Sequence, residues 1–475
     1  MRAIWFRHDL RVHDHAALFD AVQSGEKVHA VYVWDERFED EQVPALKRMG
    51  SHRLLFLIES LEDLLSSLNA LGIELTVLSG HVQTVIPAWL TKNKIEHVYI
   101  NEHPGVEERQ DLDTIIQLTP EINWHKREGH TLFSHDQLPF DLKEFPMSFT
   151  RFRKKLEKEL LIPKKDTKYT FEEQQLIQEA VEPYNFGNKL KKRVPARLAL
   201  RSEMRLSAKG IVDGGEAAAL ERLIEYVGEP DYLFNYKNTR DGLLSFDDSS
   251  KLSFWLASGC LSPKRVYQTI LSMESKNKRN ESSYWLFFEL LWREYFQWLM
   301  VATDQKLFRL NGLLTYERQW SHNQDLFDKW KKGLTGYPLI DAAMTELNTT
   351  GYMSNRARQN VASFLTKNLG INWLWGARYF EEQLIDYDPA SNYGNWAYQA
   401  GVGTDMRELR AFNVVGQGIR YDSEGDYVKH WLKLPADLPG NIVYDPYKLM
   451  NEISWKEPVV DQQDSLNRRR KEWGL

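Results

Sequence analysis

The first third of the chain alternates short apolar runs with a longer helical pattern. Between residues 51 and 71, leucine and isoleucine recur near helical spacing, and Gly72 follows as a stop signal. Strand-length runs stand at residues 3–6 (AIWF), 28–34 (VHAVYVW), 74–78 (ELTVL) and 97–100 (HVYI). Strands that alternate with helices predict a parallel, doubly wound sheet. Such a sheet binds ligands beyond the carboxyl ends of its strands.

The pattern changes after about Leu132. Residues 133–205 are rich in proline, lysine and arginine, which predicts a long interdomain linker draped over the surface. The remainder is helical in pattern, and Gly351 breaks it. The clearest helices are expected at residues 283–302 (nearly continuously apolar, hence buried on most sides), 338–347 and 354–369. We therefore predict an α/β domain over 1–132, a linker over 133–205 and an all-helical domain over 206–475.

Composition narrows the classes of function. Apolar runs stay below the roughly 18 residues of a membrane span, and the first residues lack a signal-peptide core, so we expect a cytoplasmic protein. Cys260 is the only cysteine, which excludes internal disulfides and multi-cysteine metal sites. The net charge of −6 means that a nucleic-acid surface must be a local patch. The motifs GxGxxG, GK[ST], HExxH and GxSxG, typical of nucleotide, metal and acyl chemistry, are absent.

Two polar constellations allow a functional and a structural interpretation. Residues 247–253 (DDSSKLS) precede an apolar helix, so their hydroxyls and the helix N–H groups suit a phosphate or pyrophosphate, or simply cap the helix. Arg358 is expected on a helix and Asp386 in a loop before another segment. A buried pair of these two could flank a polar heterocycle whose redox state changes, or could be a structural ion pair.

Two further sets also allow a functional and a structural interpretation. The 16 tryptophans include Trp320, Trp373 and Trp396, on three separate segments, which could fill the core or relay electrons. Glu289 and Arg293 lie four residues apart in the apolar helix. A carboxylate there must be paired, either with Arg293 or with a ligand in a cavity.

Together these segments resemble one family, the photolyases and cryptochromes. The resemblance runs in order from residue 2 to about residue 447, which is far more specific than any single motif. It rests on residues 5–12 (WFRHDLRV), 286–296 (LFFELLWREYF), 335–344 (TGYPLIDAAM), 352–359 (YMSNRARQ) and 386–398 (DYDPASNYGNWAY).

Within that family the chain most resembles the DASH cryptochromes. Residues 236–253 (YKNTRDGLLSFDDSSKLS) and 391–402 (SNYGNWAYQAGV) carry this similarity. Enzymes for six-four photoproducts have histidines where this chain has Ser354, Asn355 and Gln359, so that activity is not expected. The position that faces flavin N5 is Asn392, as in repair enzymes and DASH proteins.

The resemblance assigns roles to individual residues. The residues expected to bind FAD are Tyr236, Ser249, Ser250, Lys251, Leu252, Ser253, Arg293, Asn355, Arg358, Asp386, Asp388 and Asn392. Trp396, Trp373 and Trp320 would form the inner, middle and outer members of a photoreduction chain, and Glu289 would hydrogen-bond the damaged bases. The residues expected to contact DNA are Arg240, Glu289, Trp292, Gln359, Tyr398 and Gln417.

The implied activity is that of a deoxyribodipyrimidine photo-lyase, which splits cyclobutane pyrimidine dimers by electron transfer from photoexcited reduced FAD. Single-stranded DNA is the expected substrate, with RNA kept open as a second nucleic acid, and the chain is expected to be a monomer or weak dimer. The alternative is a blue-light photoreceptor or nucleic-acid-binding flavoprotein without repair. Glu108 occupies a position like the acid that binds a methenyltetrahydrofolate antenna, although a solvated carboxylate at a helix start is an equal interpretation.

Overall fold

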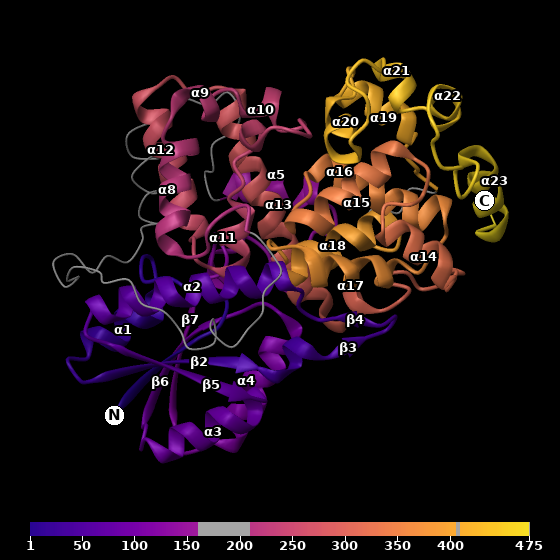
Figure 1. Cartoon of the computed structure of the whole chain (residues 1–475). Helices are drawn as coiled ribbons and strands as arrows, with labels where there is room; N and C mark the ends of the chain where they lie inside the picture. Colours follow the sequence, from indigo (N-terminus) through magenta and orange to yellow (C-terminus); the bar gives the residue numbers. More distant parts are fainter. Residues whose placement is uncertain (160–209, 405–408, 475) are drawn as a thin grey trace. The chain divides into compact units, whose positions relative to one another are not determined.

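The computed structural model describes residues 1–159, 210–404 and 409–474 (Figure 1). The chain forms two compact units. Unit 1 consists of Met1–Asp40, Leu54–Lys237 and Ser250–Asp304, and unit 2 consists of Glu41–Arg53, Asn238–Ser249 and Gln305–Leu475. Residues 160–209, which include residues 160–205 of the expected linker, lie outside the described residues. The boundaries 1–132, 133–205 and 206–475 therefore stay a prediction.

Unit 1 contains a five-stranded parallel sheet in the order β5-β2-β1-β6-β7. Its strands are β1 (Arg2–Phe6), β2 (Val28–Asp35), β5 (Glu74–Gly80), β6 (His97–Glu102) and β7 (Asn123–Glu128). The four strands predicted from apolar runs are confirmed. β7 was not predicted, because this edge strand (NWHKRE) is polar and only half-buried.

Side chains alternate between the two faces of the sheet, as parallel strands covered on both sides require. One face, with Trp5 and Val31, packs against apolar residues of α3 (Val82–Lys92) and α4 (Val106–Leu118). On the other face α1 (Ala16–Gln23) packs against β1 and β6, and Phe6 meets His15 edge-on. The doubly wound arrangement is therefore confirmed (Figure 1).

Helices make up the rest of both units. Those of unit 1 are α2 (Ser51–Ala70, which begins in unit 2), α5 (Phe149–Glu159), α8 (Glu216–Val227), α9 (Pro230–Leu233), α10 (Tyr236–Thr239, which ends in unit 2), α11 (Ser253–Ser258), α12 (Pro263–Lys276) and α13 (Glu281–Thr303). Those of unit 2 are α14 (Gln324–Lys331), α15 (Pro338–Thr350), α16 (Asn355–Ser363), α17 (Trp373–Gln383), α18 (Pro389–Ala400), α19 (Val414–Tyr421), α20 (Asp426–Leu432), α21 (Gly440–Val443), α22 (Pro446–Glu452) and α23 (Gln462–Glu472). Unit 2 also holds a short hairpin of β3 (Glu41–Gln42) and β4 (Leu46–Lys47).

The expected helices of the C-terminal half are confirmed, with one change. Gly351 ends α15 in the left-handed region at φ 72°, as its break in the pattern predicts. The helix predicted over 354–369 is α16 followed by a π-helical turn at Phe364–Asn368. Periodicity does not distinguish these two, because a π turn keeps its apolar side chains buried.

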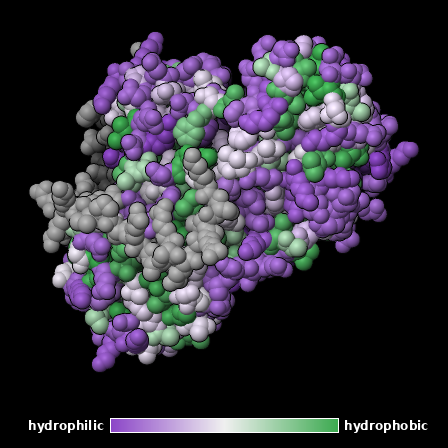
Figure 2. Space-filling model, viewed as in Figure 1, coloured by the Kyte–Doolittle hydropathy of each residue, from purple (hydrophilic) through white to green (hydrophobic). Residues whose placement is uncertain are grey.

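On the face drawn in Figure 2, hydrophilic residues dominate the surface, and hydrophobic residues form only small patches. Across the described ranges, no helix combines the length and the apolar character needed to cross a membrane.

Candidate functional site

The predicted flavin residues are divided between the two units. Tyr236, Ser250, Lys251, Leu252, Ser253 and Arg293 belong to unit 1, and Ser249, Asn355, Arg358, Asp386, Asp388 and Asn392 belong to unit 2.

In unit 2, Arg358 of α16 and Asp386 form a direct ion pair. Nη2 of Arg358 donates to Oδ2 of Asp386 at 2.9 Å, and Nε donates to the carbonyl of Met353 at 2.7 Å. The Asp386 side chain is 4% exposed, and that of Arg358 is 24% exposed. The guanidinium is thus held in one orientation beside a buried carboxylate.

The other oxygen of this carboxylate fits a polar ligand. Oδ1 of Asp386 is buried and meets no hydrogen-bond donor among the described residues. A buried acceptor without a donor costs free energy, so such an atom marks a place for a missing partner. FAD carries N–H and O–H donors and meets this requirement.

Two more predicted flavin residues are fixed by the start of α18. Asp388 caps the helix, and its Oδ1 accepts from the N–H of Ser391 at 2.7 Å. Nδ2 of Asn392, one turn into the helix, donates to the carbonyl of Ala377 at 2.9 Å. Both side chains are buried, whereas Asn355, at the start of α16, is exposed.

The serine segment before α11 is irregular, as a phosphate-binding loop or a cap would be. Lys251 is buried and takes the left-handed conformation at φ 59°. Ser250 is held through its carbonyl, which accepts from Nε of Arg222 at 3.1 Å. Leu252 occupies the cap position of α11, and Ser253 begins the helix.

The three predicted tryptophans are arranged around α17. Trp373 begins this helix, is fully buried and donates its indole N–H to the carbonyl of Leu310 at 2.8 Å. Trp396 lies against the helix at Gly376, where an added Cβ would stand 2.3 Å from its ring. Trp320 precedes Ser321, which pairs with Ile371 just before α17. One helix thus connects all three segments.

The expected substrate residues of unit 1 lie on α13. Glu289 and Trp292 are three residues apart and half-buried. The ring of Phe149 from α5 stacks on Trp292, with centroids 3.7 Å apart and planes 10° apart. Arg293 donates to the carbonyl of His130 and toward its Nε2, both at 2.8 Å.

The remaining expected DNA residues belong to unit 2. Gln359 accepts from Arg356 at 2.9 Å, and Arg356 also contacts Asp241 at 3.0 Å. Oε1 of Gln417, on α19, is buried and meets no donor within the ranges that the structure describes. Arg240 and Tyr398 are half-buried.

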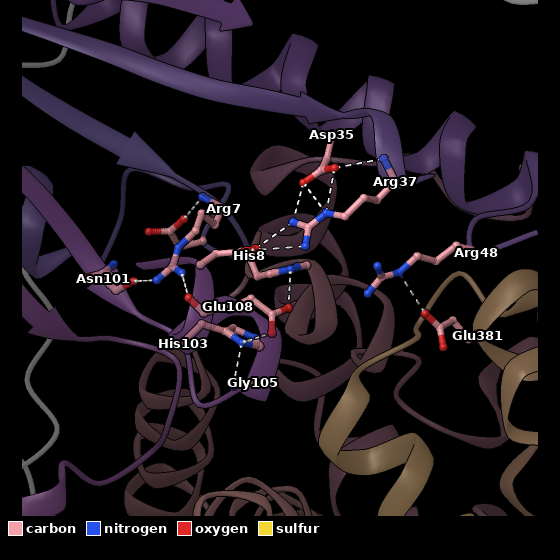
Figure 3. A network of polar contacts seen from close by, with 12 residues as sticks. Arg7, His8, Asp35, Arg37, Arg48, Asn101, His103, Gly105, Glu108 and Glu381 are labelled. Atoms are coloured by element: carbon pink, nitrogen blue, oxygen red, sulfur yellow. Dashed lines mark hydrogen bonds and ion pairs between the residues drawn. The ribbon is translucent and has the colours of Figure 1, made fainter. Parts of the chain in front are cut away.

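Glu108, the antenna candidate, lies in a cluster of basic side chains at the carboxyl end of the sheet (Figure 3). Nε2 of His8 is 3.2 Å from one carboxylate oxygen, and Nδ1 of His103 is 3.8 Å from the other. The half-buried guanidinium of Arg7 donates to the carbonyls of Glu108 and Asn101 at 2.9 and 3.0 Å. The two histidines follow different strands, β1 and β6, and were not predicted to lie near Glu108.

Protonation in this cluster follows from burial and from hydrogen bonds. Burial, reinforced by the neighbouring His130, lowers the pKa of His103 well below its ordinary value. Nδ1 of His103 accepts from the N–H of Gly105 at 3.0 Å, which requires a neutral ring. Burial alone would raise the pKa of Glu108, but its basic neighbours lower it. Because His103 is neutral, His8 is the partner that favours the Glu108 carboxylate.

Comparison with known proteins identifies the family to which a parallel α/β sheet followed by these helices belongs. Residues 2–170 match the family model for DNA photolyase, and residues 285–473 match that for the FAD binding domain of DNA photolyase. A protein named cryptochrome DASH from Gloeobacter violaceus is 41% identical, with 96% of this chain and 92% of that protein covered. The chain belongs to the DASH cryptochromes of the photolyase and cryptochrome family.

Solved structures agree with this membership. The crystal structure of the Synechocystis cryptochrome has a TM-score of 0.89 and 36% identity, covering 99% of this chain and 98% of that one. A bacterial class III photolyase from Agrobacterium tumefaciens has a TM-score of 0.83 and 25% identity, covering 100% and 97%. The predicted fold class, an α/β domain with a helical FAD-binding domain, is confirmed. The chain therefore carries an FAD-binding domain.

Proposed function

We propose that this chain repairs cyclobutane pyrimidine dimers by light-driven electron transfer from reduced FAD, with single-stranded DNA as its preferred substrate. The observation that carries the proposal is the Arg358–Asp386 pair, whose buried carboxylate still lacks one donor in the described part of the chain. A fixed cation and a carboxylate with a free acceptor suit a ring whose charge changes during the reaction.

When bound, FAD supplies light absorption and one-electron transfer, giving an electron to the dimer from its reduced form and taking one from the protein in its oxidised form. In this proposal Arg358, Asp386 and Asn392 hold the flavin ring, and Ser249 to Ser253 hold its phosphates. Trp396, Trp373 and Trp320 carry electrons to it.

Two side chains on one face of α13 support dimer recognition. Residues three apart on a helix are neighbours, so the Glu289 carboxylate and the Trp292 ring can contact the same ligand. A carboxylate accepts hydrogen bonds from base N–H groups, and an indole offers a stacking surface. Tyr398 would supply a second aromatic contact.

Weak stacking explains the expected preference for single strands. Phe149 stacks on Trp292 with ring centroids 3.7 Å apart, so a protein side chain already covers part of the indole that a base would stack on. Stacking contributes ~1–3 kcal/mol per base, which is comparable with the few kcal/mol needed to flip a dimer out of a duplex. The net charge of −6 also gives little general attraction to duplex phosphates.

The test is a repair assay with one preparation of reduced, FAD-loaded protein under a fixed dose of blue light. Matched oligonucleotides carry the same dimer in a single strand, in a mismatched bubble and in a duplex. We expect efficient repair in the single strand, intermediate repair in the bubble and poor repair in the duplex at physiological salt.

Glu289→Gln is the matched variant, because it keeps size but removes the charge. We expect slower repair with unchanged FAD content. Equal rates on single strand and duplex would overturn the substrate preference. Persistence of all dimers while reduced FAD stays bound would instead favour a photoreceptor or a nucleic-acid-binding flavoprotein. We place this activity in the cytoplasm, in a chain that is monomeric or weakly dimeric, with RNA as a competitor to test.

We further propose methenyltetrahydrofolate as an antenna held at Glu108. The charged carboxylate beside His8 supports this role, since it can accept from N–H groups of a pterin. A near-ultraviolet absorption band beyond that of flavin, lost in Glu108→Gln, is the expected result. The Sulfolobus tokodaii photolyase contains two FAD molecules, so a flavin excess over one per chain would point to that kind of antenna instead.

A further inference from the structure

Within unit 2, a buried tyrosine touches the middle tryptophan of the predicted electron chain. The rings of Tyr393 and Trp373 meet edge to face, with centroids 6.3 Å apart and planes 77° apart. The Tyr393 hydroxyl donates to Oε2 of Glu381 at 2.9 Å. Tyr393 is 7% exposed and Glu381 4% exposed, so bulk water does not compete for this proton.

Glu381 is well placed as the acceptor of that proton. Its other oxygen, Oε1, lies 3.6 Å from Nε of Arg48, whose side chain is 25% exposed (Figure 3). A separation of 2.9 Å between hydroxyl and carboxylate oxygens is within the range for direct proton transfer. Burial, together with the Glu381 charge, raises the pKa of Tyr393 well above its ordinary value. The phenol therefore stays protonated until it is oxidised.

A second aromatic residue beside the predicted electron-transfer tryptophans, Trp473, is surrounded by cations. Trp473 meets Trp320 with centroids 5.7 Å apart. The Arg318 guanidinium stands 4.1 Å from the centroid of Trp473, the Lys367 ammonium 4.3 Å and the Arg469 guanidinium 6.0 Å. Cations are attracted to a neutral indole but repel one that has lost an electron. Oxidation of Trp473 is therefore disfavoured, although its ring lies as close to Trp320 as the ring of Tyr393 lies to Trp373.

We propose that Tyr393 is a proton-coupled electron donor to Trp373, with Glu381 as its proton acceptor. This role rests on the proposed photoreduction through the three tryptophans, which supplies the oxidant, the radical cation of Trp373. One electron passes from Tyr393 to Trp373 and restores the neutral indole. The phenolic proton moves from Oη to Oε2 of Glu381. The products are a neutral tyrosyl radical and a protonated Glu381.

Charge distribution favours this step. Before it, a positive charge sits on Trp373, which is 0% exposed, while Glu381 is paired with Arg48. After it, Trp373, Tyr393 and Glu381 are all neutral, and the positive charge remains on the partly hydrated Arg48. An unpaired charge is more stable at a site that water reaches than in the interior.

Electron paramagnetic resonance of the oxidised, FAD-loaded chain, illuminated and frozen without DNA, tests the proposal. Deuterated tyrosine should narrow the protein radical signal, and deuterated tryptophan should leave it unchanged. In Tyr393→Phe we expect a tryptophan radical that decays faster. Glu381→Gln keeps the shape but removes the proton acceptor, so formation of the tyrosyl radical should slow on the order of a hundredfold. In heavy water the wild-type step should slow as well.

Trp473→Phe is the matched control and should leave the tyrosyl signal unchanged. A tyrosine signal that persists in Tyr393→Phe, or one lost in Trp473→Phe, overturns the proposal. If Tyr393→Phe fails to bind FAD, an unchanged rate in Glu381→Gln overturns it equally. Because no DNA is present, absence of dimer repair does not affect the result. If every radical is lost in Trp396→Phe while a tryptophan radical is retained in Tyr393→Phe, electron transfer through the tryptophans is separated from the additional step at Tyr393.

Discussion

Arg358 donates to one oxygen of Asp386 at 2.9 Å, and the other oxygen is buried with no donor from any residue that the structure describes. A purely structural ion pair would be expected to satisfy both oxygens, because an unmet buried acceptor costs about 1–3 kcal/mol. The pair is therefore better explained as part of a binding site. The pair lies within the matched FAD-binding domain, which is why we propose FAD as its ligand.

Arg358→Ala should strip the flavin from the chain. The substitution leaves the Asp386 carboxylate buried without its cation, which costs about 3–5 kcal/mol locally. We expect FAD absorbance to fall to a small fraction of the wild-type value after gel filtration. Arg468→Ala, on the exposed face of α23, is the control and should keep FAD. Full retention of FAD by Arg358→Ala would count against this pocket.

Trp396→Phe separates electron transfer from packing. The ring of Trp396 meets Phe380 at 5.0 Å and Trp330 at 6.3 Å, and phenylalanine keeps most of these contacts. Folding should therefore survive, with a cost of about 1–3 kcal/mol. Photoreduction of oxidised FAD should slow greatly, while repair from chemically reduced FAD continues. Trp89→Phe, on α3 in the core that packs against the sheet, should affect stability alone.

The strands and helices named from the sequence were accessible from hydrophobic periodicity, because each has at least one continuous apolar face. α13 was predicted at 283–302 and observed at Glu281–Thr303. Many other elements were not named individually, and two of them show why. The edge strand β7 has few apolar residues, and α5 lies within the proline- and charge-rich stretch expected as linker, although its buried face includes Phe149 and Phe152.

The candidate site was accessible only where its residues stand in contiguous motifs. Arg358 and Asp386 were paired from the sequence, and the structure brings them together. The contacts of Glu108 with His8 and His103 were not predicted: His8 comes from a distant segment after β1, and the contact with His103, in the same loop-to-helix stretch as Glu108, follows no periodic pattern. Tyr393 lies within a motif, but its role depends on Glu381, twelve residues earlier on another helix. Spacing cannot report contacts that the tertiary fold creates.

Glu294→Ala should be among the most destabilising changes in α13. Its carboxylate accepts from the backbone N–H groups of Leu132 and Phe133 at 2.7 and 3.1 Å, and from the indole of Trp298 at 2.7 Å. Three buried donors lose their acceptor, and each costs about 1–3 kcal/mol. We expect a loss of about 3–5 kcal/mol in chemical denaturation. Glu121→Ala, on the surface, should change stability by less than about 0.5 kcal/mol.

His103 should make the folded chain sensitive to mild acid. Burial, with help from His130, lowers the pKa of His103 well below 6.5, so the folded state keeps this ring neutral. The unfolded chain binds a proton below its own pKa of about 6.5. As pH falls below that value, the unfolded state gains protons that the folded state does not, and the free energy of unfolding decreases. One such group contributes a slope of at most about 1.4 kcal/mol per pH unit.

His103→Asn removes the titrating ring but keeps an acceptor for the N–H of Gly105. We therefore expect a flatter dependence of the free energy of unfolding on pH between 6.5 and the lower pKa of the folded state. The measurement is chemical denaturation at half-unit pH steps, with flavin content followed in parallel. His430→Asn, on an exposed position of α20, is the control and should keep the wild-type slope. An identical slope in His103→Asn and wild type would mean that His103 is protonated in the folded state. That result would contradict the hydrogen bond from Gly105 and leave His103, as well as His8, to hold the charge on Glu108.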